Sequence, residues 1–308
     1  LEKLDMGVIN RRPGALPTVD AEALKFVMAE MVREAGVNVY LHSWCADAVM
    51  EGNAVRGAVF ESKSGRQAIL ADVVVDATGD GDVFGAAGAE YEHRKYRIGL
   101  VSRLGGLDRV DASKGGKAEK PKDLGSATPV PGIHWVNMQG PDADALDVND
   151  LTRLELDHRR QIWKKLQEIR KRPGYEKVYL AETAPQLGVR VSRLLVGTGK
   201  LTLDAAKSDK PYDDVIGYGG QCYDLRAEWP IPYGALVPVK VDNILAAGRC
   251  ICTAANMVEP MRLIAPCFVT GHAAGAAAAL AVKAKRPPRQ VPVSMLQALL
   301  KEQGAYLG

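Results

Sequence analysis

The sequence predicts an α/β fold, and three observations carry that prediction. A helical apolar pattern follows residue 20, and short strand patterns separated by turn residues follow that helix. The apolar run at residues 73–75 then ends in a glycine-rich turn, as buried strands of parallel sheets do. A second strand that ends in a glycine turn lies far along the chain, at residues 242–249. Helix, short strands and buried strands in this order indicate an α/β layout.

The first helix is expected to begin after Asp20 and to end at Gly36. Asp20 is a favourable N-cap, and the apolar residues behind it recur at helical spacing until that glycine. Turn residues then divide the chain into short strands that are expected to form an antiparallel meander. These strands are residues 37–41, 54–60 and 67–70.

The middle of the chain is expected to form an inserted α+β domain. Residues 111–132 are rich in Lys, Gly and Pro and have no apolar period, which predicts a mobile loop. A helix is expected over residues 150–171, because its apolar residues fall on one side and Pro173-Gly174 follows it. Short strands and turns are expected over residues 178–238.

The last part of the chain is expected to return to the first sheet with the strand 242–247 and the turn Gly248-Arg249. A helix over residues 266–283 has Pro266 in its first turn, where proline is favoured, and a short helix follows at 294–303. Ala and Gly dominate the longer helix. We therefore expect it to be buried in the core, since spanning segments rely on strongly apolar side chains.

Composition narrows the class of partner. The chain has 308 residues, 47% of them hydrophobic, which is enough for a large core. Its net charge of +3 gives no basic face of the kind that binds nucleic acid, so a small molecule is the expected partner. Its five cysteines are scattered and odd in number, which favours a reducing cytoplasm over a disulfide framework.

The turn at Ala77-Thr78-Gly79 has two interpretations. It follows a buried strand, the usual place for a ligand in an open α/β sheet, and Gly79 lets the backbone approach a cofactor closely. A tight turn that simply needs glycine is the alternative. The second strand-to-glycine unit, which ends at Gly248 and precedes a helix, favours the ligand.

Three long runs resemble the FAD-dependent oxidoreductase family, which is distantly similar to the fumarate reductase and succinate dehydrogenase flavoproteins. The runs are DATGDGDVFGAAGAEYE (76–92), AETAPQLGVRVSRLLVG (181–197) and NILAAGRCICTAANMVEPMRLIAPCFVTGHAAGAAAALAV (243–282), and EAGVNVYLHSW (34–44) fits the same pattern. The resemblance implies an FAD/NAD(P)-binding, Rossmann-like three-layer fold, incomplete at the N-terminus, with an inserted α+β substrate domain. It implies a first part of the FAD-binding domain at 1–95, a substrate or cap domain at 96–235 and a C-terminal part of the FAD-binding domain at 236–308.

The resemblance also assigns contacts with FAD. Cys45 and Ala46 lie beside the adenine, the turn residues line the nucleotide cleft, and Gly248 and Arg249 lie by the ribityl chain and phosphates. Related proteins often have an acidic residue where Arg249 stands. The start of the long helix faces the flavin pyrimidine edge, where its positive end stabilises the reduced ring. The implied cofactor-binding residues are Cys45, Ala46, Ala77, Thr78, Gly79, Gly248, Arg249, Ala265, Pro266 and Cys267.

One family feature is missing from the sequence. The strand, Gly-x-Gly-x-x-Gly turn and helix that hold the FAD pyrophosphate have no counterpart here. Gly79-x-Gly81 is followed by Gly85 one place too late, and Gly197-x-Gly199 has no third glycine. The resemblance therefore implies that this unit comes from a separate polypeptide, from a part removed by proteolysis, or from residues outside the sequence.

Three residues are catalytic candidates. Hydride transfer needs the substrate's polar end held by a charged or hydrogen-bonding group, and Arg262, just before the long helix, is the first choice. A structural ion pair with Glu259 is its alternative. Arg190 is a second candidate, and His134, after a loop, is a candidate base that has simple exposure as its alternative. No metal site is expected, since zinc needs four ligands and Cys250-Ile251-Cys252 has no second pair nearby.

The sequence thus predicts an FAD-dependent oxidoreductase, a cytoplasmic and oligomeric flavoprotein. It would transfer hydride between flavin N5 and a small polar metabolite such as an organic acid, a sugar or an alcohol, with the pyrophosphate loop supplied by a companion chain or segment. The alternative is a non-catalytic subunit of a flavoprotein complex that has lost stable FAD binding. A dehydrogenase that uses only a nicotinamide cofactor is a weaker alternative, because no complete dinucleotide fingerprint is present.

Overall fold

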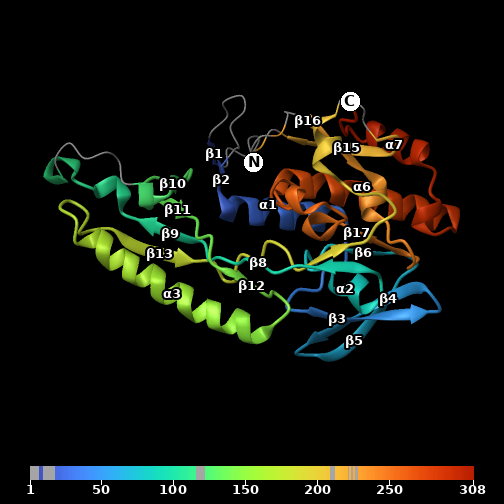
Figure 1. The fold of residues 1–308 in the computed structure, drawn as a ribbon, viewed down its shortest axis with the longest axis horizontal. Helices are drawn as coiled ribbons and strands as arrows, with labels where there is room; N and C mark the ends of the chain where they lie inside the picture. The colour runs from blue at the N-terminus through green and yellow to red at the C-terminus, as the bar shows by residue number, and fades with distance from the viewer. Residues whose placement is uncertain are drawn as a thin grey trace. The chain divides into compact units, whose positions relative to one another are not determined.

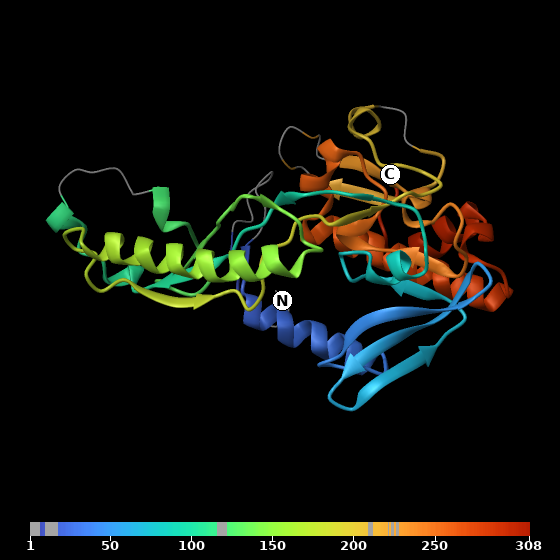
Figure 2. The same cartoon turned by 60° about the horizontal axis from the view of Figure 1, so that its bottom comes forward.

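The chain divides into two compact units, which are described separately. The structure is a computed structural model that describes residues 7–9, 18–115, 122–208, 212–220, 222, 225 and 228–308. The first unit comprises the described residues of 1–39 and 95–189, and the second comprises those of 40–94 and 190–308 (Figures 1 and 2). The first unit's larger segment begins beside the predicted domain boundary at 96 and ends well before the one at 235, and the functional domain boundaries stay predictions.

The first unit is built on an antiparallel sheet with one long helix. The strand order is β10-β11-β9-β13, so β9 is central and β10 and β13 are at the edges. Helix α3 (Val148–Arg170) runs alongside this sheet in both views (Figures 1 and 2). The strands are β9 (Ser102–Gly105), β10 (Ser126–Ala127), β11 (His134–Val136) and β13 (Tyr179–Thr183).

Helix α3 confirms the prediction of a helix over residues 150–171. The side chain of Asp147 accepts a hydrogen bond from the Asn149 amide at 2.9 Å and caps the first turn. Its buried residues recur at helical spacing, and two of them, Leu166 and Ile169, pack with Leu104 of β9 in one apolar cluster. The helix and the sheet therefore share a core.

Helix α1 (Ala21–Glu34) also lies where the sequence predicts it. Asp20 is its N-cap and accepts from the Ala23 amide at 2.8 Å. None of the residues of α1 is buried, however, and Phe26 and Met31 are 52% and 64% exposed. An apolar helix face thus lies open in the part of the chain that the structure describes.

The predicted strand at residues 37–41 is wrong. These residues have no strand partner among the described residues, and Leu41 is 75% exposed. Their β-branched and aromatic side chains favour an extended chain, but a strand also needs a neighbour to accept its hydrogen bonds. The meander starts instead with β3 (Trp44–Glu51), followed by β4 (Ala54–Ser62) and β5 (Gly65–Leu70), which pair in the order β3-β4-β5. The meander is thus confirmed with its first strand displaced.

The second unit places a parallel strand pair between the meander and a long helix. Strand β6 (Val74–Asp76) pairs in parallel with β17 (Ile244–Ala246), with Val74 opposite Ile244. Helix α6 (Ile264–Ala284) packs against both strands on one side, and the meander and α2 (Asp82–Ala86) lie on the other (Figure 1). The parallel pair confirms that the chain returns to its first sheet. This layered α/β arrangement is the predicted fold class.

Helix α6 is a core helix. By length and composition alone it is apolar enough to cross a membrane, the one such helix among the described residues. Its small residues Ala273, Ala274 and Ala277 are fully buried in the largest apolar cluster of the chain, together with Trp229 and Leu245. The predicted buried helix is therefore confirmed, and its alanines let the strands approach closely.

The remaining elements are short. Helix α7 (Val293–Glu302) packs on α6 and confirms the predicted terminal helix. Within residues 111–132 the described part forms 3-10 turns and β10, and residues 116–121 lie outside the described residues, as do 209–211, 221, 223–224 and 226–227 of the predicted strand-and-turn segment 178–238. The other elements are β1 (Val8–Ile9), β2 (Thr18–Val19), β7 (Tyr91–His93), β8 (Tyr96–Arg97), β12 (Asp142–Ala143), β14 (Arg193–Leu195), α4 (Leu203–Lys207), β15 (Val215–Gly220), β16 (Glu228–Pro232) and α5 (Val258–Met261).

The stability of the first unit should depend on one acid-sensitive ion pair. Arg172 holds Asp123 through two hydrogen bonds, Nη1 to Oδ1 at 2.9 Å and Nη2 to Oδ2 at 2.5 Å, and these lower the pKa of Asp123. A carboxyl whose pKa is lower in the folded state stabilises the fold above its unfolded pKa of about 3.9. That stabilisation is lost as the pH falls through the folded pKa.

We therefore expect Asp123→Asn to lower the free energy of unfolding at pH 7 by less than about 1 kcal/mol, since both side chains are partly solvated. The difference from the wild type should shrink towards zero as the pH falls below about 4. Denaturant unfolding of both proteins between pH 3 and pH 7 measures it. A difference that does not change with pH would contradict the assignment.

Candidate functional site

Two loops that are distant in sequence meet at one edge of the β6–β17 pair. The two strands are parallel, so the residues after Asp76 and those after Ala246 leave from the same end. The Ala247 amide donates to the Asp76 carbonyl at 2.9 Å and continues the pairing up to the loops. Thr78 and Gly248 therefore stand side by side at the carboxyl ends of the strands, where open α/β sheets bind ligands.

Asp76 fixes the shape of the first loop. Its side chain is fully buried, and Oδ1 accepts from the Thr78 hydroxyl at 2.7 Å and from the Thr78 amide at 3.1 Å. Oδ2 accepts from the amides of Val83 and Phe84, each at 2.9 Å, at the start of α2. A carboxylate with four donors, two of them at a helix N-terminus, is strongly held. The loop at 77–82 is therefore clamped at both ends by one side chain.

Asp80 joins three segments of the second unit. Its Oδ2 accepts from Arg249 Nη2 at 2.7 Å, and its Oδ1 accepts from the Ser192 hydroxyl at 2.6 Å. Arg193 Nη1 donates to the Asp80 carbonyl and to Asp82 Oδ1, both at 3.0 Å. Partial burial, and then the charge of Asp80, raise the pKa of Asp82, and Arg193 opposes that rise. Two acids and two arginines thus tie the loops together.

Gly79 and Gly248 adopt conformations that favour glycine. Their φ angles are +79° and +82°, in the left-handed region where a side chain is strained. A Cβ atom on Gly79 would collide with the guanidinium of Arg249, which lies against the backbone there. A Cβ atom on Gly248 would stand 3.8 Å from the sulfur of Cys267, and the Gly248 amide donates to Thr270 Oγ1 at 3.0 Å. The Gly248 loop therefore lies against the first turns of α6, and the Gly79 loop lies against Arg249.

The N-terminus of α6 has no side-chain cap. Leu263 precedes it in an extended conformation and makes no capping hydrogen bond through its side chain. Ala265 is exposed, Pro266 is buried and Cys267 is half-buried, and burial raises the pKa of the Cys267 thiol. The positive end of this long helix is therefore available beside Gly248 to stabilise negative charge.

Arg190 and Arg262 share one carboxylate. Arg190 Nη1 donates to Glu259 Oε1 at 3.1 Å, and Arg262 Nε donates to Glu259 Oε2 at 3.0 Å, with a second contact from Arg262 Nη2. The side chain of Arg190 is 9% exposed and that of Arg262 is 23% exposed. The ion pair that the sequence leaves open for Arg262 is therefore present. Arg262 is the more accessible of the two arginines.

The two predicted adenine contacts lie on β3, in the same unit. Cys45 packs against the main apolar core, and Ala46 is exposed. Burial raises the pKa of the Cys45 thiol most, and the charges of Asp76 and Asp82 raise it further. Strand β3, which carries both residues, packs against α2, directly after the first loop.

His134 belongs to the first unit. It begins β11, and its Nδ1 lies 3.2 Å from the carbonyl oxygen of Leu124. The structure therefore gives this half-buried histidine a structural contact within its own unit. Its proposed role as a base stays a prediction.

Sequence reasoning did not single out Asp76, Asp80 or Ser192. The signal for Asp76 and Asp80 is the run Asp76–Asp82 itself, in which aspartates alternate with turn residues after a buried strand. Ser192 gives no such signal, because its partner Asp80 lies 112 residues away in the chain. Only the fold brings them together.

The residues at the loops fit FAD. The Nε atoms of Arg193 and Arg249 are buried and have no hydrogen-bond partner within the described part of the chain. Buried donors of this kind need an acceptor, and the phosphate and hydroxyl oxygens of a dinucleotide are suitable ones. Gly79, Gly248 and the uncapped helix end add a backbone that a ligand can approach closely. The fold and this edge define a dinucleotide-binding α/β protein.

Comparison with known protein families also indicates an FAD-binding protein, and it identifies the family. The FAD dependent oxidoreductase family matches residues 3–100 and 106–300. The chain belongs to this family, and FAD is its cofactor. The predicted resemblance is thereby confirmed at the level of the family.

Solved structures with a related fold are distant. A geranylgeranyl bacteriochlorophyll reductase-like protein from Thermoplasma acidophilum is 14% identical over 92% of this chain and 60% of its own, with a TM-score of 0.47. The p-nitrophenol 4-monooxygenase from Pseudomonas putida is 13% identical over 93% and 56%, with a TM-score of 0.41. The L-proline dehydrogenase from P. horikoshii is 12% identical over 94% and 62%, with a TM-score of 0.35. This chain spans less than two thirds of each of these proteins. A search of curated proteins finds no match.

Proposed function

We propose that this protein transfers hydride between flavin N5 and a small polar metabolite, such as an organic acid, a sugar or an alcohol. The observation that carries the proposal is the meeting of the Thr78 and Gly248 loops at the ends of β6 and β17, with Arg249 bound between them to Asp80. FAD, when bound, supplies the hydride acceptor or donor. The chain supplies the arginine donors and the α6 N-terminus, which hold negative charge.

Arg262 is the residue that we propose to hold the substrate's polar end. It follows α5 and precedes α6 directly, and its guanidinium is partly exposed, whereas Arg190 on the same carboxylate is buried. In this arrangement Glu259 fixes the orientation of Arg262. Arg190 holds Glu259 from the other side, so it acts on the substrate through its neighbours.

Replacing Arg262 by Lys should separate these roles. Lysine keeps the charge and the pair with Glu259 but loses the planar fork that binds a carboxylate with two hydrogen bonds. We expect the rate at which the substrate reduces the flavin to fall by roughly tenfold or more, while the FAD content stays nearly unchanged. Stopped-flow bleaching, with the substrate found in a panel of acids, sugars and alcohols, measures the rate.

Glu259→Gln is the matching control for Arg262→Lys. It weakens both ion pairs but leaves Arg262 in place. If Arg262 contacts the substrate, Arg262→Lys should slow reduction more than Glu259→Gln does. Equal loss of activity and FAD in Arg262→Lys would show that the arginine only supports the fold.

We further propose that a companion chain or segment completes the nucleotide site with its own Gly-x-Gly-x-x-Gly turn. Among the described residues β6 pairs only with β17, so its other edge has no strand neighbour. Residues 37–41 are exposed, four of the five are apolar or aromatic, and they also lack a strand partner in the described part of the chain. Unpaired edges of this kind accept a further strand. The completed protein would be a cytoplasmic oligomer.

The visible spectrum of the native assembly tests both proposals. A yellow assembly that releases FAD on denaturation, as identified by chromatography, supports a complete flavoenzyme. The mass of its components then shows whether a second chain is present. A colourless assembly without nucleotide would favour the other candidate, a non-catalytic subunit that keeps the fold.

A further inference from the structure

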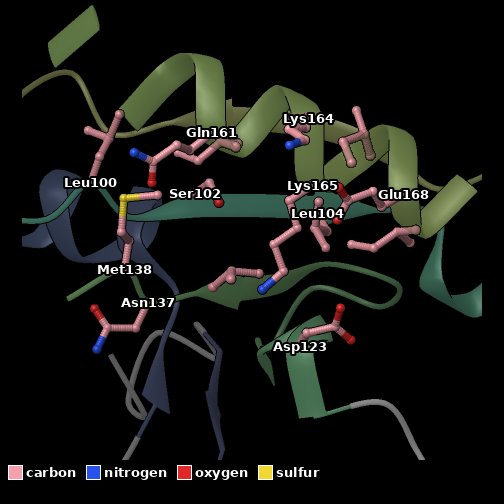
Figure 3. Close-up of a pocket in the computed structure, with 14 residues that line it drawn as sticks. Leu100, Ser102, Leu104, Asp123, Asn137, Met138, Gln161, Lys164, Lys165 and Glu168 are labelled. Carbon is pink, nitrogen blue, oxygen red and sulfur yellow. The ribbon is translucent and has the colours of Figure 1, made fainter. Parts of the chain in front are cut away.

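None of the residues that line a pocket in the first unit is assigned to FAD or to catalysis. It has a volume of about 430 Å³ and lies between α3 and the strands β9 and β11 (Figure 3). Pockets of roughly 300–1,000 Å³ bind small molecules. Half of the residues that line it have apolar side chains and half have polar or charged ones, and none is aromatic. The aliphatic lining residues include Leu100, Leu104, Val136, Ile162, Leu166 and Ile169.

Ser102 is a polar residue that lines this pocket between two leucines, Leu100 and Leu104. It stands on β9 between Leu100 and Leu104, and because side chains alternate along a strand, all three point to the same face, towards α3 (Figure 3). Val136 of β11 is its direct cross-strand neighbour and lines the same pocket. Ser102 is only 4% exposed and its hydroxyl forms no side-chain hydrogen bond with any described residue, but the hydroxyl oxygen is not among the fully enclosed unpaired atoms, so it remains accessible from the pocket.

A hydroxyl beside apolar side chains needs a hydrogen-bond partner, and water or a ligand in the pocket can supply one. Valine or leucine would pack better at this position of a central strand. The hydroxyl is therefore available to donate to a polar atom of a ligand in the pocket. The surrounding aliphatic side chains indicate that the rest of that ligand is apolar.

The positive charge of Lys165 indicates that the polar end of the ligand is negatively charged. Lys165 reaches from α3 down into the pocket, and its ammonium group makes no ion pair or hydrogen bond with a described residue, although its charge helps to lower the pKa of Asp123 (Figure 3). Two carboxylates also line the pocket, Asp123 and Glu168, but Asp123 is held by both nitrogens of Arg172. Lys164, Lys165 and Arg172 are three positively charged side chains, and Asp123 and Glu168 are the two carboxylates. One positive charge is left for an anion.

We propose that this pocket binds an aliphatic monocarboxylate, with the carboxylate accepting from Ser102 and pairing with Lys165 and the chain lying against the leucines and isoleucines. A carboxylate has enough lone pairs to accept from both donors at once. The apolar side of the lining has no aromatic ring on which a flat ligand could stack, so it fits a flexible alkyl chain better than a ring. Binding at this site does not require flavin, so the proposal can be tested independently of the oxidoreductase proposal.

Calorimetric titration of the purified protein with sodium decanoate tests the proposal, and 1-decanol serves as the uncharged probe. We expect one decanoate per chain and clearly weaker binding of decanol. Lys165→Gln should weaken decanoate binding by about tenfold and leave decanol binding nearly unchanged. Ser102→Ala should weaken binding of both probes, because either head group accepts from the hydroxyl.

Lys171→Gln is the matched control for Lys165→Gln. Lys171 lies at the C-cap of the same helix, is exposed and does not line the pocket. It should leave decanoate binding unchanged. The proposal is overturned if the wild type does not bind decanoate, if decanol binds equally well, or if Lys171→Gln weakens binding as much as Lys165→Gln does.

Discussion

Asp76→Ala should unfold the nucleotide edge of the second unit. The substitution removes the acceptor that the described structure gives to the Thr78 hydroxyl and to the amides of Thr78, Val83 and Phe84, at a position that is fully buried. Unpaired buried donors cost about 1–3 kcal/mol each. We therefore expect the free energy of unfolding to fall by about 3 kcal/mol or more, and the FAD content to fall with it. Guanidinium titration and the ratio of flavin to protein absorbance measure both.

Two further variants distinguish the role of Asp76 from a general effect of charge. Asp76→Asn keeps the size of the side chain but turns an amide group towards donors, so it should also destabilise the protein strongly. Asp72→Asn removes a carboxylate just before the same strand, where the side chain is exposed, and should change stability by less than about 0.5 kcal/mol. If Asp72→Asn and Asp76→Asn have similar effects, the clamp that we describe does not hold the loop.

Arg249→Gln should release FAD while leaving the fold intact. Arg249 lies between Gly79 and Asp80, and its buried Nε has no partner among the described residues. If a cofactor oxygen accepts from that nitrogen, losing the charged donor should raise the dissociation constant of FAD by about tenfold or more. Its side chain is 27% exposed, so the cost to folding should be modest. Flavin fluorescence on dilution of the native assembly measures dissociation.

The same experiment with Arg286→Gln controls for the loss of a positive charge. Arg286 is exposed, lies beyond the C-terminal end of α6 and makes only a long contact to the Gln290 carbonyl. It should leave FAD affinity unchanged. Asp80→Asn adds a second comparison, because it frees Arg249 from its partner. If Asp80→Asn lowers FAD affinity as far as Arg249→Gln does, the arginine serves only to position the loop.

The sequence predicted the elements that carry their own signals. Helices α1 and α3 have favourable N-caps and helical spacing, and α6 has a proline in its first turn. The strands β6 and β17 end in glycine turns, so their parallel pairing could be expected as well. In each case, local chemistry and the final packing favour the same structure.

The predictions that failed depended on neighbours. Residues 37–41 have good strand propensity but no strand beside them, whereas β3 pairs with β4 despite a sequence with a weaker pattern. Strand formation depends on pairing as much as on propensity. The sequence of a short segment does not show whether another strand will lie beside it. The prediction of a strand at residues 37–41 was therefore wrong because it took no account of the tertiary neighbours of the segment.

The candidate site was predicted in outline but not in its charges. The two loops were placed correctly, because each follows a buried strand that ends in glycine. The bonds that lock them were not, because Asp80 binds Ser192 and Arg249, which are 112 and 169 residues further along the chain. Charge pairs between residues so far apart in the chain give no periodic pattern in the sequence. The shared use of Glu259 by two arginines is a finding of the same kind.

The parallel pair also sets an order of events during protein synthesis. When β6 leaves the ribosome, the strand that will lie beside it, Ile244–Ala246, has not yet been made. Domains acquire structure from the N-terminal side as the chain grows, and contacts between distant segments form late. Strand β6 must therefore remain without its parallel partner until residues 77–243 have been made. A chaperone that shields extended apolar segments should bind nascent chains halted before residue 244 and release those that extend past α6.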